Sequence, residues 1–124
     1  MIDKKESTKE VKLAVEALDE KKGENICVID ISKISILGDY FVITNGTNST
    51  QVQALANNVE EKLVKKGYLC KQMEGYRSAH WIVLDFGSVI VHIFDAKNRA
   101  KYDLEHIWRD GVFVDVKELL SYQD

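Results

Sequence analysis

The stretch Glu74–Trp108 reads EGYRSAHWIVLDFGSVIVHIFDAKNRAKYDLEHIW, and it predicts the central β-hairpin of the fold. Within it, Trp81–Phe86 and Val89–Phe94 are short runs rich in β-branched and aromatic residues, which are typical of strands. Gly87-Ser88 between them is a two-residue turn signal. The sequence therefore predicts two paired strands that belong to a larger sheet.

The position of the turn also predicts which strand residues face each other. With Gly87 and Ser88 as the loop, Leu84 pairs with Val91, and side chains alternate between the two faces of the hairpin. One face is then entirely apolar and consists of Ile82, Leu84, Phe86, Val89, Val91 and Ile93. The other, which we call the mixed face, carries Trp81, Val83, Asp85, Ile90, His92 and Phe94. A slip of one residue would exchange the two faces.

The mixed face is the main candidate for a functional site, because a hairpin that only filled a core would not need Trp, Asp and His among aliphatic residues. We predict that this face binds a macromolecule, with Trp81 as its aromatic anchor. The predicted partner-binding residues are Trp81, Val83, Asp85, Ile90, His92 and Phe94, followed by Arg99 and Tyr102 just beyond the hairpin. The alternative is that a helix covers this face.

The other elements follow from hydrophobic periodicity and capping signals. Two long helices are expected, from the capping-box pattern Ser7-Thr8-Lys9-Glu10 to Gly23 and from Asn48-Ser49 to Gly67. Further strands are expected at Ile26–Ile31, Tyr40–Thr44 and Tyr68–Met73, and short helical segments at Leu104–Trp108 and after Asp115-x-x-Glu118. This order predicts an α/β (α+β) fold with one mixed β-sheet of about five strands flanked by helices.

Length and composition predict a single domain over residues 1–124. The chain is 45% hydrophobic and contains no proline that would mark a linker. Its N-terminus lacks the apolar segment of a signal peptide, and no run approaches the ~18 apolar residues of a membrane span. We expect a cytoplasmic protein without membrane contact, in which Cys27 and Cys70 lie in strands as buried free thiols.

The charge balance argues against nucleic acid as the primary partner. The formal net charge is −3, the isoelectric point is near 5.6, and the basic residues are dispersed along the chain. A protein that acts mainly on nucleic acid usually has a basic face that neutralises phosphates. A basic protein remains a suitable partner for this acidic chain.

Residues that could support catalysis do not converge. Gly87-Ser88 followed by Asp103-Leu104-Glu105 resembles the magnesium-binding pattern of nucleotidyltransferases. In a helical pattern, however, residues i and i+2 point in different directions and cannot hold one metal ion. We therefore expect no catalytic residue, no enzyme activity and no cofactor.

The histidines and one loop offer weaker candidates for ligand binding. The histidines, His80, His92 and His106, lack a metal-ligand spacing, and the predicted register places His92 opposite Val83. We expect no metal site. The loop 45–50 could bind an anion at a helix N-terminus, or it could simply cap that helix.

Three segments together resemble the ribosomal silencing factor family, also called RsfS or Iojap. They are Asp39-Tyr40-Phe41-Val42-Ile43, Asn45-Gly46-Thr47, and the series E-G…W-I-V-L-D-F-G…V-I-V-H-I-F…R…Y-D-L-E…W that begins at Glu74. Each is weak alone, but their fixed order and spacing extend over most of the chain. The resemblance implies a sheet like that of nucleotidyltransferases without the active site, which accounts for the magnesium-like pattern.

The resemblance also implies a function. Family members are small cytoplasmic proteins, with mitochondrial and plastid relatives. They bind the large ribosomal subunit through its protein fourteen and prevent the small subunit from joining. This implies a translation repressor that acts by steric exclusion. The mixed face could also form a homodimer of the free protein that opens to bind the ribosome.

The motif positions of the family that this sequence contains are Asp39, Glu74, Gly75, Trp81, Asp85, Gly87, His92, Arg99, Tyr102, Leu104, Glu105 and Trp108. The resemblance implies that Trp81 and Asp85 face the ribosomal protein. Gly75 and Gly87 are implied to meet backbone requirements, and Leu104 and Trp108 to dock the short helix. Arg99, Tyr102 and Glu105 fit either an ion-paired scaffold or the interface. Thr50 and His80 depart from the residues common in the family.

Two other functions remain open from the sequence. A nucleotide-using enzyme on the same sheet would depend on Asp103 or Glu105 for magnesium-dependent nucleotide binding. A self-associating adaptor would instead pair the mixed faces of two copies, because an apolar-and-polar patch can form a two-fold contact.

Overall fold

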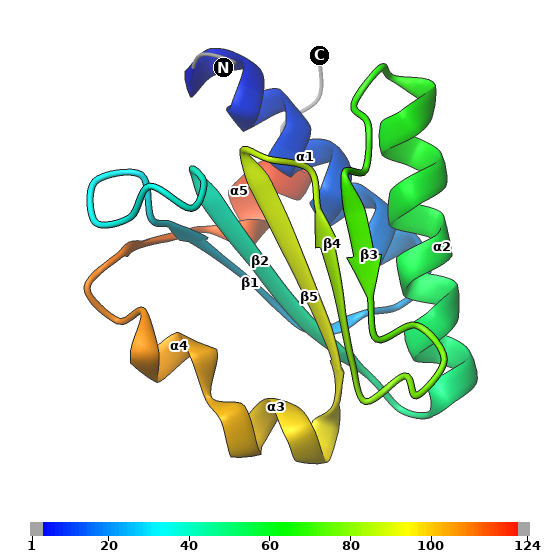
Figure 1. Cartoon of the computed structure of the whole chain (residues 1–124). Helices are drawn as coiled ribbons and strands as arrows, with labels where there is room; N and C mark the ends of the chain where they lie inside the picture. The colour runs from blue at the N-terminus through cyan, green and yellow to red at the C-terminus, as the bar shows by residue number, and fades with distance from the viewer. Residues whose placement is uncertain (1–3, 122–124) are drawn as a thin grey trace.

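The computed structural model describes residues 4–121, which form one six-stranded mixed sheet with helices on both of its faces (Figure 1). The strands are β1 (Glu24–Asp30), β2 (Tyr40–Gly46), β3 (Gln72–Glu74), β4 (Trp81–Asp85), β5 (Val89–Asp95) and β6 (Val112–Val114). The helices are α1 (Lys4–Glu20), α2 (Ser49–Lys65), α3 (Ala96–Tyr102), α4 (Leu104–Ile107) and α5 (Val116–Ser121). The predicted fold class is confirmed, with one strand more than expected.

The strand order is β3-β4-β5-β2-β1-β6, and only the central pair β2–β5 is parallel. The hairpin of β4 and β5 has the predicted register, because Leu84 faces Val91 and His92 faces Val83. At the turn, the backbone N–H of Phe86 donates to the carbonyl of Val89 at 3.0 Å. The assignment of side chains to the two faces of the hairpin is therefore correct.

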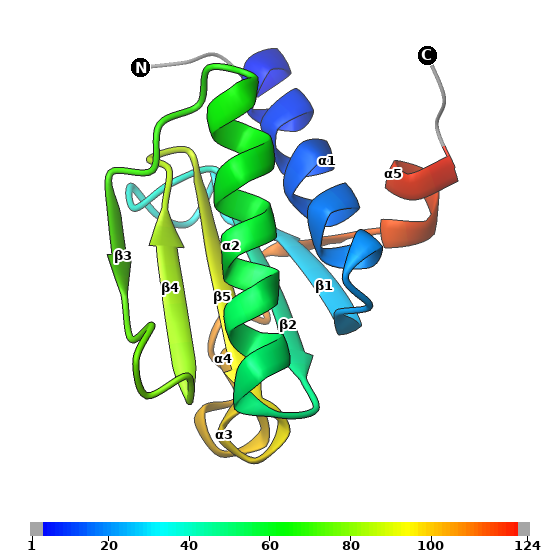
Figure 2. The same cartoon turned by 90° about the vertical axis from the view of Figure 1, so that its right-hand side faces the viewer.

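The apolar face of the hairpin packs against α2 and α1, and α5 packs against α1 and β1 on the same side of the sheet (Figure 2). Side chains on the opposite face of the sheet form a second, smaller core. Its buried members are Ile29, Ile31, Phe41, Ile43, Phe94 and Leu104, with Cys27, Trp81, Ile90 and Trp108 packed at its margin. The smaller core lies under α3 and α4 (Figure 1).

The helix α2 agrees closely with its sequence prediction. Asn48 is the N-cap, and its side-chain oxygen accepts a hydrogen bond from the backbone N–H of Gln51 at 2.8 Å. Gly67 follows the last turn with φ +93°, a conformation that glycine adopts without steric cost. The buried stripe consists of Val52, Leu55, Ala56, Val59 and Leu63, as expected. At the C-terminal end of the chain, Asp115 caps α5 through the N–H of Lys117 at 2.9 Å, also as predicted.

The predicted capping box at the start of the first helix is wrong. Ser7 and Glu10 lie inside α1, which already includes Lys4, and both of their side chains are buried. The residues therefore face the protein interior instead of closing a helix end. Their spacing fits a capping box and also fits one buried face of a helix, because residues i and i+3 are neighbours on a helix surface.

Four further boundaries differ from the predictions. The strand expected at Tyr68–Met73 is β3 at Gln72–Glu74, so Cys70 lies in a loop and not in a strand. The helix α3 was not predicted, because its sequence AKNRAKY has no apolar stripe and none of its residues is buried. The strand β6 was missed because it has only three residues and pairs with the distant strand β1. The expected helix at Leu104–Trp108 is α4, which ends at Ile107, with Trp108 as its C-cap.

Two predictions concerned the cysteines and membrane spans. Cys27 and Cys70 are free thiols that are half-buried, and burial raises the pKa of Cys27 to about 11. Within residues 4–121, no helix combines the length and the hydropathy needed to cross a membrane.

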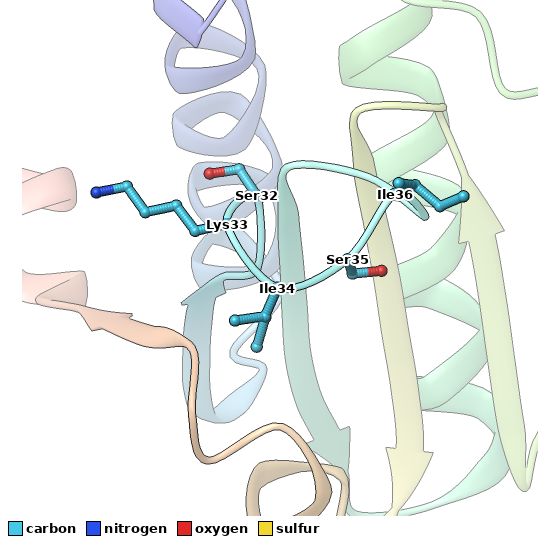
Figure 3. Close-up of a pocket in the computed structure, with 5 residues that line it drawn as sticks. All are labelled: Ser32, Lys33, Ile34, Ser35 and Ile36. Atoms are coloured by element: carbon cyan, nitrogen blue, oxygen red, sulfur yellow. The ribbon is translucent and has the colours of Figure 1, made fainter.

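Residues 32–38, between β1 and β2, form a compact loop that we call the aliphatic loop (Figure 3). The backbone N–H of Ile31 donates to the carbonyl of Asp39 at 2.9 Å and closes the base of the loop. The N–H groups of Ile34 and Ser35 both donate to the Ile31 carbonyl at 3.0 Å. Several of its backbone N–H groups thus have partners in the loop or at its base, whereas several of its apolar side chains are exposed.

Candidate partner-binding site

The structure divides the mixed face into an exposed layer and a buried layer. Trp81, Val83, Asp85 and Ile90 are half-buried, whereas His92 is 6% exposed and Phe94 is completely buried. Phe94 lies in the small core together with Leu104 of α4, so in this conformation it offers no surface to a partner. The alternative of a helix over this face is correct only for the part under α3 and α4.

Trp81 lies in the middle of an aromatic stack. Its ring is 4.9 Å from that of Phe94, in a stacked arrangement, and 4.7 Å from that of Tyr102. The indole N–H donates to Nδ1 of His92 at 3.1 Å, so this donor is already used within the protein. Trp81 can offer a partner only the outer surface of its ring. The side chain also stabilises the fold, which the sequence did not indicate.

His92 is the buried hydrogen-bond partner of the Trp81 indole. Because its Nδ1 accepts the indole hydrogen bond, the proton of the neutral ring is assigned to Nε2. Burial lowers the pKa of His92 to about 4, so the ring is neutral at pH 7. Nε2 is buried and has no hydrogen-bond partner among the described residues. His92 is therefore a buried support for the surface, and its predicted direct contact with a partner does not fit its burial.

Asp85 lies at the hairpin-turn end of the mixed face. Its Oδ1 accepts a hydrogen bond from the backbone N–H of Gly87 at 2.8 Å, which holds the carboxylate next to the turn. The side chain is half-buried, so it still presents negative charge at the surface. Gly87 has φ +89°, which explains why a glycine occupies this turn position.

Arg99 joins four elements of the structure. Its Nη1 donates to the carbonyl of Glu24 at 3.1 Å and to the side-chain oxygen of Asn45 at 2.9 Å. Its Nη2 forms an ion pair with Glu105 at 2.9 Å, and the Arg99 side chain is only 12% exposed. The sequence left open whether Arg99 was scaffold or interface. These contacts fasten α3 and α4 to β1 and β2, so they assign it to the scaffold.

Tyr102 is the predicted site residue that is most accessible. It is 42% exposed, and the Nζ of Lys101 lies 5.6 Å from the centre of its ring. Since Tyr102 also contacts Trp81, it continues the exposed layer from β4 onto α3. We call Trp81, Val83, Asp85, Ile90 and Tyr102 the docking face.

The residues of the magnesium-like pattern have structural contacts. Glu105 pairs with Arg99, and Asp103 occupies the junction of α3 and α4 with a left-handed backbone at φ 48°. His80 contacts Asp95 through Nδ1 at 2.9 Å. Burial raises the pKa of Asp95, but hydrogen bonds from Asn98 and His80 outweigh it and lower the pKa overall. Within residues 4–121, no group of three or more His, Cys, Asp or Glu side chains is placed to hold a metal ion.

The loop 45–50 is occupied by its own side chains. The backbone N–H of Thr47 donates to the Gln51 side chain at 2.6 Å, and the N–H of Gln51 donates to Asn48. Of the two sequence interpretations, the capped loop describes this arrangement. The N–H groups of Thr47 and Gln51 at this helix end are therefore already paired.

Two features near the site lie outside the predicted partner-binding residues. Trp108 packs edge-on against Phe41, with ring centres 5.1 Å apart, and extends the apolar cluster across β2. The aliphatic loop lies at the end of β1 and contributes the exposed side chains of Ile34, Ile36 and Leu37. Three aliphatic residues within a seven-residue loop, SKISILG, were a visible signal.

The chain is similar in sequence to a known protein family and to several of its members. A family model described as "Ribosomal silencing factor during starvation" matches residues 4–124. The chain belongs to the ribosomal silencing factor family. The ribosomal silencing factor RsfS of Halalkalibacterium halodurans is 37% identical over 111 residues, which cover 90% of this chain and 95% of that protein. RsfS of Bacillus subtilis is 38% identical over 106 residues, which cover 86% of this chain and 90% of the relative.

A solved structure has the same fold. The crystal structure of a protein from Chromobacterium violaceum matches with a TM-score of 0.79 and 38% sequence identity, over 81% of this chain and 83% of that chain. In the present chain, the motif glycine Gly75 has φ +82° and lies against the Trp81 backbone. Leu104 is buried in the small core, and Trp108 lies at its margin. Several family motif positions thus have structural contacts, and Trp81, Asp85 and Tyr102 remain on the docking face.

Proposed function

We propose that this protein binds the large ribosomal subunit through ribosomal protein fourteen and blocks association with the small subunit. The observation that carries the proposal is the docking face, a half-exposed layer of apolar and aromatic side chains with one carboxylate on a well-packed sheet. Stable interfaces bury about 800 Å² per partner around aromatic anchors. The outer ring surface of Trp81, with Val83 and Ile90 beside it, matches that description.

Charge supports a basic protein as the partner. The chain carries a net charge of −3, and Asp85 presents a carboxylate at one end of the docking face. Complementary charge steers the encounter of two proteins and fixes their orientation. Repression would then require no turnover, because a bound domain excludes the small subunit by its volume alone.

The test is co-sedimentation with isolated bacterial large ribosomal subunits, followed by addition of small subunits. We expect the protein to migrate with the large subunit and to reduce the peak of joined subunits. Val83→Asp places a charge in the middle of the docking face and should abolish both effects. Val64→Asp, on the exposed surface of α2 across the sheet from the docking face, makes the same change and is the matched control. A wild-type protein that stays at the top of the gradient would refute the proposal.

Self-association through the same face is the second candidate for the free protein. The docking face leaves Val83 and Ile90 half-exposed in the single chain. A two-fold contact between two copies would cover these residues in both copies at once. Sedimentation velocity over a range of concentrations tests this. A dimer that Val83→Asp dissociates supports self-association, and a monomer at all concentrations refutes it.

A further inference from the structure

The aliphatic loop exposes apolar side chains that no other element covers. Ile36 is fully exposed, Leu37 is 59% exposed and Ile34 is 46% exposed. Figure 3 shows Lys33 and Ile36 extending in opposite directions from the loop. Residues 32–36 line an open pocket of about 530 Å³. Grouped apolar side chains at a surface are typical of interaction sites.

The loop is held firmly, so its side chains are presented in a fixed arrangement. Besides the bonds at its base, Ser32 donates through its N–H and its hydroxyl to Oδ1 of Asp30 at 3.0 and 2.7 Å. The N–H of Leu37 donates to the hydroxyl of Ser35 at 2.9 Å. An element that is already ordered loses little conformational entropy when it binds. Ile36 and Leu37 are therefore exposed on an ordered loop and not on a flexible segment.

The loop is joined to the docking face at the hairpin turn. The N–H groups of Asp39 and Tyr40 both donate to the carbonyl of Ser88, at 2.7 and 3.0 Å. Gly38 fits so closely that a Cβ there would lie 2.9 Å from the Gly87 carbonyl oxygen. The turn connects the strand ends that carry Asp85 and Ile90. The loop thus continues the docking face beyond Asp85, and α3 and α4 lie at the opposite end of the strands (Figure 1).

The chemistry of the loop selects a protein surface. Three of its four exposed residues are aliphatic, and the fourth, Lys33, is its one charged residue. Binding to RNA would require several cations to neutralise phosphates. The docking face alone also offers few fully exposed apolar groups, since Phe94 and His92 are buried. A protein partner on the docking face would reach a larger apolar contact by covering the loop as well.

We propose that the aliphatic loop is a second contact element for the protein that occupies the docking face. Ile36 and Leu37 enter an apolar recess of that protein, and Lys33 pairs with an acidic or carbonyl group at its edge. This inference rests on the proposed ribosomal function, and it adds a contact element outside the predicted site residues.

The experiment compares wild-type protein with the double variant Ile36→Ser/Leu37→Ser in binding to isolated large ribosomal subunits. Serine suits this loop, which already contains two, and both positions are exposed, so the thermal unfolding curve should not change. We expect the affinity to fall about tenfold or more. Leu69→Ser is the matched control, because Leu69 is 73% exposed on the loop between α2 and β3.

The outcomes separate the inference from the proposed function. If wild-type protein binds the subunit and the double variant binds equally well, the loop is not a contact and the inference fails alone. If wild-type protein does not bind, the proposed function itself fails. Loss of a dimer, or of flotation with anionic phospholipid vesicles, while subunit binding stays unchanged, would assign the loop to another occupant and overturn the inference. A photo-crosslinking amino acid at position 36 should label one ribosomal protein, and labelling of rRNA would contradict the proposal.

Discussion

The indole N–H of Trp81 donates to Nδ1 of His92 at 3.1 Å, between two strands that also pair through their backbones. This hydrogen bond fixes the orientation of the indole ring on the docking face. It also keeps His92 in one tautomer, with a pKa lowered to about 4 by burial. The residue that is expected to anchor the partner is thus held in place by a side chain that the partner does not reach.

Trp81→Phe tests how much the hydrogen bond from Trp81 to His92 contributes to stability. The variant keeps an aromatic ring but removes the donor to His92, so the free energy of unfolding should fall by about 1 kcal/mol. Trp81→Ala should lower it by about 3 kcal/mol, because the contacts with Phe94 and Tyr102 are also lost. Urea denaturation measures both values. Equal stability of the two variants would show that ring packing contributes nothing here.

Glu10→Gln should stabilise the protein at neutral and alkaline pH. Burial, and next the charges of Asp39 and Glu6, raise the pKa of Glu10 from 4.5 to about 7. The folded state therefore holds this proton more tightly than the unfolded chain, and stability falls as the pH rises from about 4.5 to about 7. Above that range the full cost, on the order of 2 kcal/mol, opposes folding.

Unfolding measured at pH 4 and at pH 8 tests this prediction. The gain in stability from Glu10→Gln should appear at pH 8 and nearly vanish at pH 4. Glu16→Gln makes the same change of charge on the same helix and serves as the control. A gain of equal size at both pH values would contradict the assignment of the raised pKa to Glu10.

Arg99→Ala should loosen α3 and α4 without disrupting the central sheet. The change removes the ion pair with Glu105 and the hydrogen bonds to Glu24 and Asn45. Breaking a largely buried ion pair of this kind costs about 3 kcal/mol. Hydrogen exchange should become faster for amides of residues 98–108 and remain slow in β2 and β5. Lys101→Ala, on the same helix and exposed, is the control.

Gly75→Ala should be among the most damaging single substitutions. Gly75 has φ +82°, and a Cβ there would lie 2.1 Å from the carbonyl oxygen of Trp81. We expect a loss of about 4 kcal/mol or more, since both backbone strain and a steric clash oppose the variant. Gly67 has a similar φ of +93° but has no atom within 4 Å of its Cβ position. Thermal unfolding of Gly67→Ala should therefore show only the strain, about 1 kcal/mol.

The parts of the fold that local signals determine were predicted correctly. Gly87-Ser88 determined the hairpin register, and Asn48 with Gly67 determined the ends of α2. The errors occurred where distant residues decide the outcome. The strand β6 exists because Val114 pairs with Val28, which lies far away in the sequence. The pattern at Ser7 and Glu10 was compatible with two structures, and packing against the sheet selected the second.

In the candidate site, too, local signals were interpreted correctly and effects of distant residues were missed. Alternation along β4 and β5 correctly grouped Trp81, Val83 and Asp85 on one face. It could not reveal that Phe94 is buried, because that burial depends on α4 and on the way Arg99 fastens it to the sheet. Whether the remaining exposed residues contact ribosomal protein fourteen stays a prediction.

The parallel pairing of β2 with β5 has a consequence for the synthesis of the chain. Residues 40–46 must wait for residues 89–95 before the middle of the sheet can close. The docking face and its support from Tyr102 require still later residues. A nascent chain therefore cannot present this surface until residues 96–108 have also emerged from the ribosome.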